Sequence, residues 1–195
     1  RNVDIFCNFA AIYCLNRTEI EKSQVYLDFI NLMTYDSNTD STIAGHHTHL
    51  YESKVPGCPR IQSADHNIRI MVEAGVPIEK ILIGVAFFSH RWDRVPDVNH
   101  GLYQPTPFKN MYGPSYTEIS LKYEDKMDYI KYWDEDAQAP FLFNGTTFIS
   151  YDDPRSVTLK CQYALDHNMG GAFYWVHHDD AGSVLFDTMY DCLNK

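Results

Sequence analysis

Hydrophobic residues along the chain gather into four short runs, separated by segments that mix apolar and polar positions. The runs lie at residues 3–11, 29–35, 80–88 and 171–176. Because they are apolar at nearly every position, they predict β-strands that are buried on both faces. Strands of this kind belong to parallel sheets that are covered by helices.

The segments between the strands carry helix signals. Residues 18–21, with the letters TEIE, have the spacing of a capping box that opens a short helix. A second helix is predicted over 63–75, which ends on Gly75, and others over 156–171 and from Ala181 to the end. The four strand–helix units fit an open doubly wound sheet and half of an eight-stranded barrel equally well. No nucleotide-binding fingerprint favours the open sheet.

The region between the third and fourth strands, residues 89–150, is irregular and rich in Tyr, Pro and Asp. A bare loop of this length is unusual inside a compact domain. We therefore predict a small α/β insertion here. Its elements are expected to be a strand near 117–123, a short helix near 125–133 and strands near 140–150.

Composition narrows the classes of partner. The net charge of −10 disfavours nucleic acid and anionic membrane surfaces, and no apolar run is long enough to span a bilayer. The N-terminus lacks the features of a signal peptide and an initiator Met, so we expect a processed or excerpted chain. An aromatic content of 14% favours surfaces that stack on ring-shaped ligands, or a Tyr-rich periphery of the core. Five scattered cysteines without a CxxC motif predict neither a disulfide framework nor a zinc knuckle.

The second strand delivers a phenol and a carboxylate, Tyr35 and Asp36, side by side to its exit. Met33 has the same strand parity as Tyr35, so the two side chains point the same way. A strand that simply ends in a Tyr–Asp turn explains this pair without any function. The residues alone leave both interpretations open.

Six segments, in this order, resemble glycoside hydrolase family 18 chitinases. They are YLDFINLMTYD (26–36), GHHTHLY (45–51), AGVPIEKILIGVAFF (74–88), NHGLYQP (99–105), FISYDDPRSV (148–157) and GGAFYW (170–175). The resemblance is to the C-terminal half of the catalytic domain. It implies an α/β fold, the TIM (β/α)8 barrel. This chain would carry strands five to eight with their helices and a small α+β insertion between strand seven and helix seven.

The resemblance also implies the limits of each part. Barrel units five and six and strand seven would occupy residues 1–92, and the insertion residues 93–150. Helix seven, strand eight and helix eight would occupy residues 151–195. The N-terminal half of the barrel would be absent. Open strand edges near Phe6 and Phe173 then predict self-association or a complementary half-barrel as partner.

The catalytic signature of the family, Asp-x-x-Asp-x-Asp-x-Glu, is missing from the chain. Asp125 and Asp128 begin its spacing, but Ile130 breaks it. The resemblance therefore implies a fragment of a secreted enzyme that cleaves β-1,4-linked N-acetylglucosamine polymers and is inactive alone, with the general acid upstream of Arg1. A lectin that binds chitin or its oligosaccharides, in which the acid was never present, is the alternative.

The resemblance implies roles for the residues at the strand ends. Hydrolysis in this family is substrate-assisted and retaining, because the N-acetyl carbonyl of the sugar attacks the anomeric carbon. Tyr35 would donate to the acetamido oxygen, and Asp36 would bind that group or its neighbour. Met33 would line the same site, and Trp175 would form a floor on which the sugar ring stacks.

The segment FFSHRW, residues 87–92, departs from the family. Phe88 lacks the hydroxyl of the usual Tyr, and His90 replaces a permanently charged Arg with a titratable side chain. Arg91 can substitute for that Arg from the next position. Trp92 and Tyr103 are expected to be aromatic walls of the substrate cleft.

Two histidine clusters raise the question of a metal. His46, His47 and His49 would need further ligands in space to bind zinc, and a loop that shapes the cleft explains them more simply. The cluster from His177 to Asp180 fits a helix cap near the site. We therefore predict no metal and no cofactor.

Overall fold

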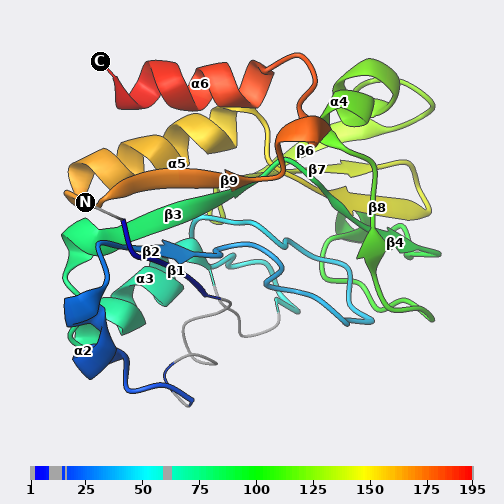
Figure 1. The fold of residues 1–195 in the computed structure, drawn as a ribbon. Helices are drawn as coiled ribbons and strands as arrows, with labels where there is room; N and C mark the ends of the chain where they lie inside the picture. Colours follow the sequence, from blue (N-terminus) through cyan, green and yellow to red (C-terminus); the bar gives the residue numbers. More distant parts are fainter. Residues whose placement is uncertain (1–2, 9–14, 16, 59–62, 195) are drawn as a thin grey trace.

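The computed structural model describes residues 3–8, 15, 17–58 and 63–194. Its first sheet contains four parallel strands in the order β1-β2-β3-β9 (Figure 1). The strands are β1 (Ile5–Asn8), β2 (Phe29–Leu32), β3 (Ile81–Ala86) and β9 (Gly171–Trp175). All four lie within the predicted runs, which confirms the parallel sheet. Residues 9–11 of the first predicted strand lie outside the described residues.

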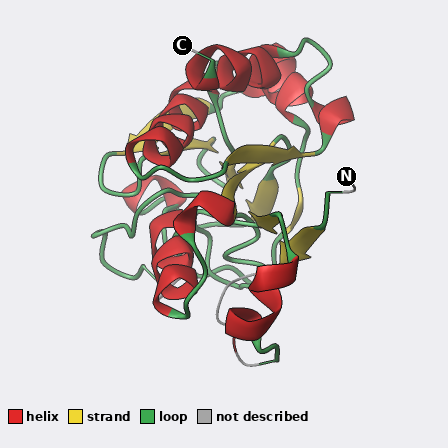
Figure 2. Ribbon diagram, turned by 60° about the vertical axis from the view of Figure 1, so that its left-hand side comes forward, coloured by secondary structure: helices red, strands yellow, loops and turns green. Residues whose placement is uncertain are grey.

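A helix follows each strand of this sheet, and in Figure 2 the helices form an arc around the strands. The α-helices are α2 (Ile20–Ser23), α3 (Ala64–Glu73), α5 (Pro154–Asp166) and α6 (Val184–Leu193). Short 3₁₀ helices are η1 (Gln24–Tyr26), η2 (Ile78–Lys80), η3 (Asn99–Gly101) and η5 (His177–Asp179). None of the described helices combines the length and apolarity that crossing a membrane requires.

Helix starts show where local sequence signals succeed and where they fail. The Ser63 side chain accepts from the His66 N–H and caps α3, and Asp153 and Ser156 form a capping box at α5. The capping box expected at residues 18–21 is wrong. The residue before α2 is Glu19, and its side chain makes no cap hydrogen bond.

The insertion between β3 and α5 is a five-stranded antiparallel sheet in the order β5-β4-β8-β7-β6. Its strands are β4 (His90–Asp93), β5 (Met111–Tyr112), β6 (Ile130–Asp134), β7 (Ala139–Phe143) and β8 (Thr147–Ser150). The strands expected near 140–150 are confirmed as β7 and β8. Strand β4 lies in the segment that the sequence left irregular, and it leads directly from β3 into the insertion.

Two predictions within the insertion are wrong. The strand expected near 117–123 is helical, because Ser115 and Glu118 form a capping box that starts α4 (Tyr116–Glu118). A π-helical turn, η4 (Ile119–Tyr123), continues it. The helix expected near 125–133 is a turn followed by β6. Asp125 and Asp128 have φ values of 53° and 62°, a left-handed conformation that a right-handed helix cannot contain.

Buried apolar side chains hold the helices to the sheet. Ile68 and Met71 of α3 pack in one cluster with Ile30 and Ile81 of the strands. In a second cluster, Val157 of α5 and Leu185 of α6 pack with the end of β3 and with β7 and β8, at the side chains Val85, Leu142 and Ile149. Each such burial stabilises the fold by roughly 1.5–3 kcal/mol. The insertion and the parallel sheet therefore share a core, which fixes β4 relative to the ends of β2 and β9.

A buried ion pair also joins the insertion to the sheet. Lys160 of α5 is fully buried, and its Nζ lies 2.7 Å and 2.9 Å from the two carboxylate oxygens of Asp152. Asp152 accepts further hydrogen bonds from Thr48 Oγ1, Ser156 Oγ and the Ala86 backbone N–H at the end of β3. Burial lowers the pKa of Lys160, and Asp152 opposes that shift.

Candidate functional site

The exits of β2, β3 and β9 meet the insertion at a small cavity of about 260 Å³. Its lining residues are Met33, Tyr35, Asp36, Phe88, Tyr112 and Trp175. Five of these six are candidates from the sequence, and they come from three strand ends separated by up to 142 residues of chain (175 − 33). The structure therefore brings the phenol, the carboxylate and the indole to one hollow.

Tyr35 forms the inner wall of this cavity. Its ring packs edge-on against Phe88, with centroids 5.6 Å apart, and only 6% of the residue is exposed. Gly84 of β3 makes room for it, because a Cβ at this position would lie 2.9 Å from Tyr35 Cε1. Burial, together with the charge of Asp36, raises the pKa of Tyr35. The phenol therefore remains protonated, which suits a hydrogen-bond donor.

The backbone turns away from the direction of β2 at Asp36, which lies at the rim of the cavity. Thr34 fixes β2 against β3, since its Oγ1 donates to the Gly84 carbonyl and accepts from the Gly84 N–H, each at 2.9 Å. Two residues later, Asp36 has a φ of 60°, and Thr39 Oγ1 donates to its carbonyl oxygen. This turn directs the Asp36 carboxylate towards β4 rather than along the strand.

His90 of β4 meets that carboxylate. Its Nε2 lies 2.7 Å from Asp36 Oδ1, and its Nδ1 accepts from the side-chain amide of Asn110. Asn110 is itself held by the Ser41 N–H, which donates to Asn110 Oδ1. His90, which stands where the family pattern has Arg, is therefore a buried contact of Asp36.

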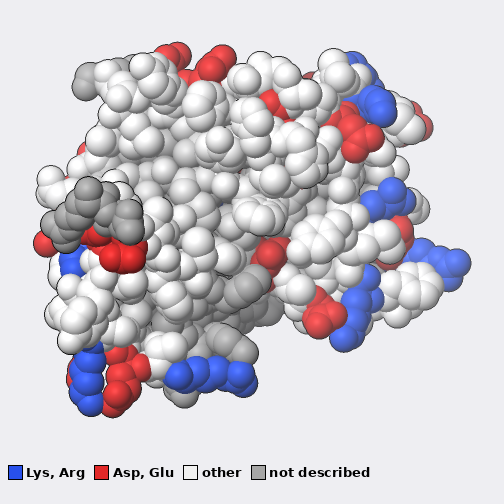
Figure 3. Space-filling model, in the orientation of Figure 1, with Lys and Arg blue, Asp and Glu red and all other residues white. Residues whose placement is uncertain are grey.

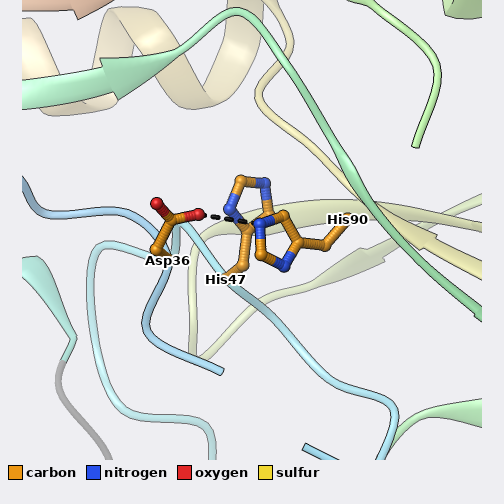
Figure 4. A group of neighbouring side chains, drawn as sticks. All are labelled: Asp36, His47 and His90. Atoms are coloured by element: carbon orange, nitrogen blue, oxygen red, sulfur yellow. Dashed lines mark ion pairs between the residues drawn. The ribbon is translucent and has the colours of Figure 1, made fainter. Parts of the chain in front are cut away.

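His47 lies face to face with His90. The two rings are nearly parallel, with an interplanar angle of 9° and centroids 4.4 Å apart, and Asp36 stands beside them (Figure 4). The His47 backbone N–H donates to Ser150 Oγ, which holds the loop against β8. Burial, and secondly the neighbouring His90, lower the pKa of His47 well below its ordinary value. His47 is therefore a neutral imidazole.

The structure separates the histidines of the 45–51 segment. His46 Nε2 lies 3.2 Å from Asp134 Oδ2 in the insertion, while His47 faces Asp36 and His90. The rings of His46 and His49 touch at a centroid distance of 5.9 Å. The side chains of His46 and His49 therefore lie in one environment, and the side chain of His47 lies in another.

Trp175 is the last residue of β9 and lines the cavity. Its side chain is 58% exposed, although its backbone oxygen is fixed by the Phe87 N–H at 2.8 Å. A larger hollow of about 510 Å³ shares Met33, Tyr35 and Trp175 and is lined mostly by apolar side chains of β9 and α6. An exposed indole on a fixed strand end provides a flat surface for a ligand.

Four expected site residues do not line the cavity: His90, which contacts Asp36, and the three that follow. Arg91 points to the opposite face of β4, where its Nε donates to Asp93 Oδ1. Trp92 is fully buried, and its Nε1 donates to the Ser41 carbonyl. Tyr103 is 6% exposed and belongs to the same insertion core as Trp92. The expectation of two aromatic cleft walls fails because β4 carries Trp92 away from the strand ends.

The sequence missed two residues of the site, Tyr112 and Asn110. Tyr112 lines the cavity because β5 pairs with β4, so that Tyr112 stands opposite His90. Both residues lie about twenty positions from His90, and no short motif links them. The expected helix cap at the other histidine cluster is confirmed, because the Asp180 carboxylate accepts from the N–H groups of Val184, Leu185 and Phe186.

Residues 6–180 match the sequence profile of the family described as Glycosyl hydrolases family 18. The chain belongs to glycosyl hydrolase family 18. Chitinase A1 of Niallia circulans is 30% identical over 190 residues, which cover 90% of this chain and 27% of the relative. Chitotriosidase-1 of Mus musculus is 29% identical, over 81% of this chain and 35% of its own length.

Solved structures give the same family and the fold. The family 18 N-acetylglucosaminidase from Paenibacillus barengoltzii superposes with a TM-score of 0.93 at 44% identity, over 97% of this chain and 56% of that one. Chitinase-like agglutinin from Robinia pseudoacacia superposes with a TM-score of 0.82 at 24% identity, over 98% of this chain and 55% of its own, which supports the fold alone. This family 18 chain therefore has an α/β fold of the TIM-barrel type. It spans between about a quarter and just over half of these proteins.

Proposed function

We propose that this family 18 chain is the sugar-binding half of a glycoside hydrolase that cleaves β-1,4-linked N-acetylglucosamine chains with retention of configuration. The observation that carries the proposal is the cavity shared by Tyr35, Asp36 and Trp175. A neutral donor, a carboxylate and an exposed indole surface are the groups needed to hold an acetylated amino sugar. Asp36 is the one charged side chain among the described residues that line this cavity, which favours a neutral ligand. The face displayed in Figure 3 also carries few charged side chains at its centre.

The proposed chemistry uses the acetamido group of the substrate. A carboxylic acid protonates the leaving glycosidic oxygen while the acetamido carbonyl oxygen attacks the anomeric carbon, which forms an oxazolinium-like cation. Water then opens this intermediate from the face that the leaving group occupied, so that configuration is retained. Tyr35 donates to the acetamido oxygen before the attack, and Asp36 accepts from the acetamido N–H as positive charge develops. Trp175 supports the sugar ring from below.

The general acid is proposed to come from a complementary half. The sequence contains no acids with the spacing of the family signature. Of the described strands in the parallel sheet, β1 and β9 are the outer ones, and we assign them as barrel strands five and eight. Their neighbourhood is apolar and exposed: Ile5 is 53% and Trp175 58% accessible. The hollow of about 510 Å³ is where the missing strands would pack.

The domain limits follow from this assignment. Residues 1–92 would supply barrel units five and six and strand seven, and residues 93–150 the insertion. Residues 151–195 would supply helix seven, strand eight and helix eight. We further propose that the parent enzyme is secreted, as chitin is an extracellular polymer, and that the isolated chain self-associates through β1 and β9.

A lectin is the second candidate. The sugar-contacting residues are present while the acid signature is absent from the sequence, and this combination suits binding without cleavage. The two candidates differ only in the complementary half, because a Glu at the end of its signature would make an enzyme.

The test combines this chain with the N-terminal half of a family 18 barrel that carries the signature. Cleavage of N-acetylglucosamine oligosaccharides is followed by chromatography, and the anomer of the first product by NMR. The account expects no cleavage by the chain alone and retained product from the complex. A complementary half with Gln in place of the acid distinguishes the lectin, since binding should persist without cleavage. Cleavage by the chain alone would contradict the proposed division of labour.

A matched pair of tryptophans tests the site within that experiment. Trp175→Ala should weaken oligosaccharide binding, because it removes the sugar platform. Trp133→Ala is the control, since Trp133 stacks under Arg155 on the insertion at 3.7 Å and is remote from the cavity lining. Equal loss of affinity in both variants would argue against the sugar floor. Sedimentation of the isolated chain as a stable monomer would argue against exposed strand edges.

A further inference from the structure

Asp36, His47 and His90 form a cluster of potential ligands at the edge of the cavity. One ligand atom from each residue lies within 4.8 Å of the other two. The side chains come from the turn after β2, the 45–51 loop and β4, and they gather around one point in Figure 4. We propose that these three residues bind one divalent transition-metal ion, for which Zn²⁺ is the probe.

The first support is the state of the two ring nitrogens of His47. Its side chain is completely buried, and neither ring nitrogen has a hydrogen-bond partner among the residues that the structure describes. A buried polar group without a hydrogen bond loses its hydration and gains nothing in return. Such a group in a folded protein calls for an occupant such as an ion or a water molecule. A bound metal ion would satisfy one of the two nitrogens.

The second support is the contact between Asp36 and His90. Asp36 Oδ1 and His90 Nε2 are 2.7 Å apart, yet neither atom makes a directed hydrogen bond. A closely approached but misaligned carboxylate and imidazole gain little from direct contact. Both atoms would gain more by facing a common cation placed between them. Three side chains thus each offer one buried polar atom with unmet bonding capacity to the same place.

The donor set determines the class of ion. Two imidazoles and one carboxylate suit Zn²⁺, Fe²⁺, Co²⁺ or Ni²⁺, whereas Ca²⁺ and Mg²⁺ prefer oxygen ligands alone. Three protein ligands leave at least one coordination position open. Asp36 is 15% exposed and lines the cavity of about 260 Å³, so this position opens towards solvent. The net charge of −10 also favours the approach of a cation.

Coordination changes the local geometry in a defined way. Bonds of about 2.0–2.2 Å in a tetrahedral arrangement place neighbouring ligand atoms about 3.4 Å apart. Asp36 Oδ1 and His90 Nε2, which lie 2.7 Å apart, must therefore move apart to admit the ion. The stacked rings of His47 and His90 must also tilt so that their lone pairs converge. Metal-bound histidines donate from their outer nitrogen. For His90 Nδ1–H to do so, the Asn110 amide must make a half-turn, which gives up the hydrogen bond from the Ser41 N–H to Asn110 Oδ1.

The site has a consequence for the sugar cavity that rests on the proposed function. An ion held by Asp36 occupies the carboxylate that is proposed to bind the acetamido group. Metal and sugar would then compete for one residue. The metal site itself requires no sugar, so its test is independent of that proposal.

The experiment is a calorimetric titration of the purified, chelator-treated chain with Zn²⁺ in the absence of sugar. We expect one ion per chain, and Co²⁺ should give visible absorption bands of a low-coordinate complex with nitrogen ligands. His47→Phe retains a buried aromatic ring and should lower the affinity for Zn²⁺ by more than about tenfold. Asp36→Asn, at the cavity rim, should lower it as well and provides a second variant if His47→Phe does not fold.

His178→Ala is the matched control, because His178 is 78% exposed and faces Asp179 at 3.3 Å outside the cluster. Its affinity and stoichiometry should equal those of the unchanged chain. Unchanged binding in a folded His47→Phe or Asp36→Asn variant would place the ion elsewhere and overturn the proposal. The absence of a one-to-one complex with either ion would overturn it too.

Discussion

Two carboxylates beside the insertion, Asp36 and Asp152, sit in opposite surroundings. Both oxygens of Asp152 are engaged, by Lys160, Thr48, Ser156 and the Ala86 N–H. Asp36 Oδ1, by contrast, has only the misaligned contact to His90 among the residues that the structure describes. A buried network in which every polar group is hydrogen-bonded stabilises one structure. A network with unmet hydrogen-bonding capacity is a candidate for binding a ligand or an ion. The difference separates a structural joint from a candidate binding site.

The largest effect is expected on the free energy of unfolding, when the hydrogen-bonded network around Asp152 is broken. Lys160→Met leaves Asp152 as a buried, unpaired charge, which costs about 3–5 kcal/mol of the free energy of unfolding. Urea denaturation followed by circular dichroism measures it. Lys54→Met is the matched control, because Lys54 pairs with Asp136 on the exposed surface and should leave stability unchanged. Equal stability of both variants would mean that the Asp152 network is not a structural joint.

Removing the phenol of the cavity should affect activity and leave stability intact. In the complex with a complementary half, Tyr35→Phe should lower kcat by about 100-fold, since a preorganised donor to the reacting group is lost. The ring and its packing against Phe88 remain. Steady-state kinetics and a melting curve measure the two effects. A variant with full kcat would exclude Tyr35 as the donor to the acetamido group.

Lowering the pH should reveal how much a second hydrogen-bonded carboxylate, Asp134, contributes to the free energy of unfolding. Burial opposes its ionisation, but hydrogen bonds from His46 and Ser53 outweigh burial and lower its pKa. As pH falls below about 3.9, the unfolded chain binds the proton first, so the free energy of unfolding decreases through the lower folded pKa. Asp134→Asn should flatten this acid slope and cost on the order of 1–2 kcal/mol near neutral pH. An unchanged slope would show that other carboxylates cause it.

The sequence predicted which residues stand at the strand ends. It did not predict the buried hydrogen-bond networks around Asp152 and Asp134. Met33, Tyr35 and Asp36 belong to one continuous segment, and Trp175 ends an apolar run, so short-range patterns contain them. The resemblance to a family supplied the roles proposed for them, and it indicated the barrel type of fold, which periodicity had left open. The four strands themselves followed from apolar runs, because parallel strands are buried on both faces.

The insertion was harder to predict, because its contacts join residues that are distant in sequence. Asn110 and Tyr112 reach His90 only through the pairing of β4 with β5. Alternating apolar residues at 117–123 resembled a strand, but the Ser115 cap starts a helix there. Trp92 shares its strand face with His90, and no local pattern shows that it lies deeper in the insertion.

The most direct test of the account is selectivity for the acetamido group. The complex of this chain with a complementary half lacking the acid is titrated with two oligosaccharides of equal length, one of N-acetylglucosamine and one of glucose. The account predicts binding of the acetylated sugar alone, with a loss of affinity of about tenfold or more in Tyr35→Phe. Equal affinity for the two sugars, unchanged by Tyr35→Phe, would contradict it.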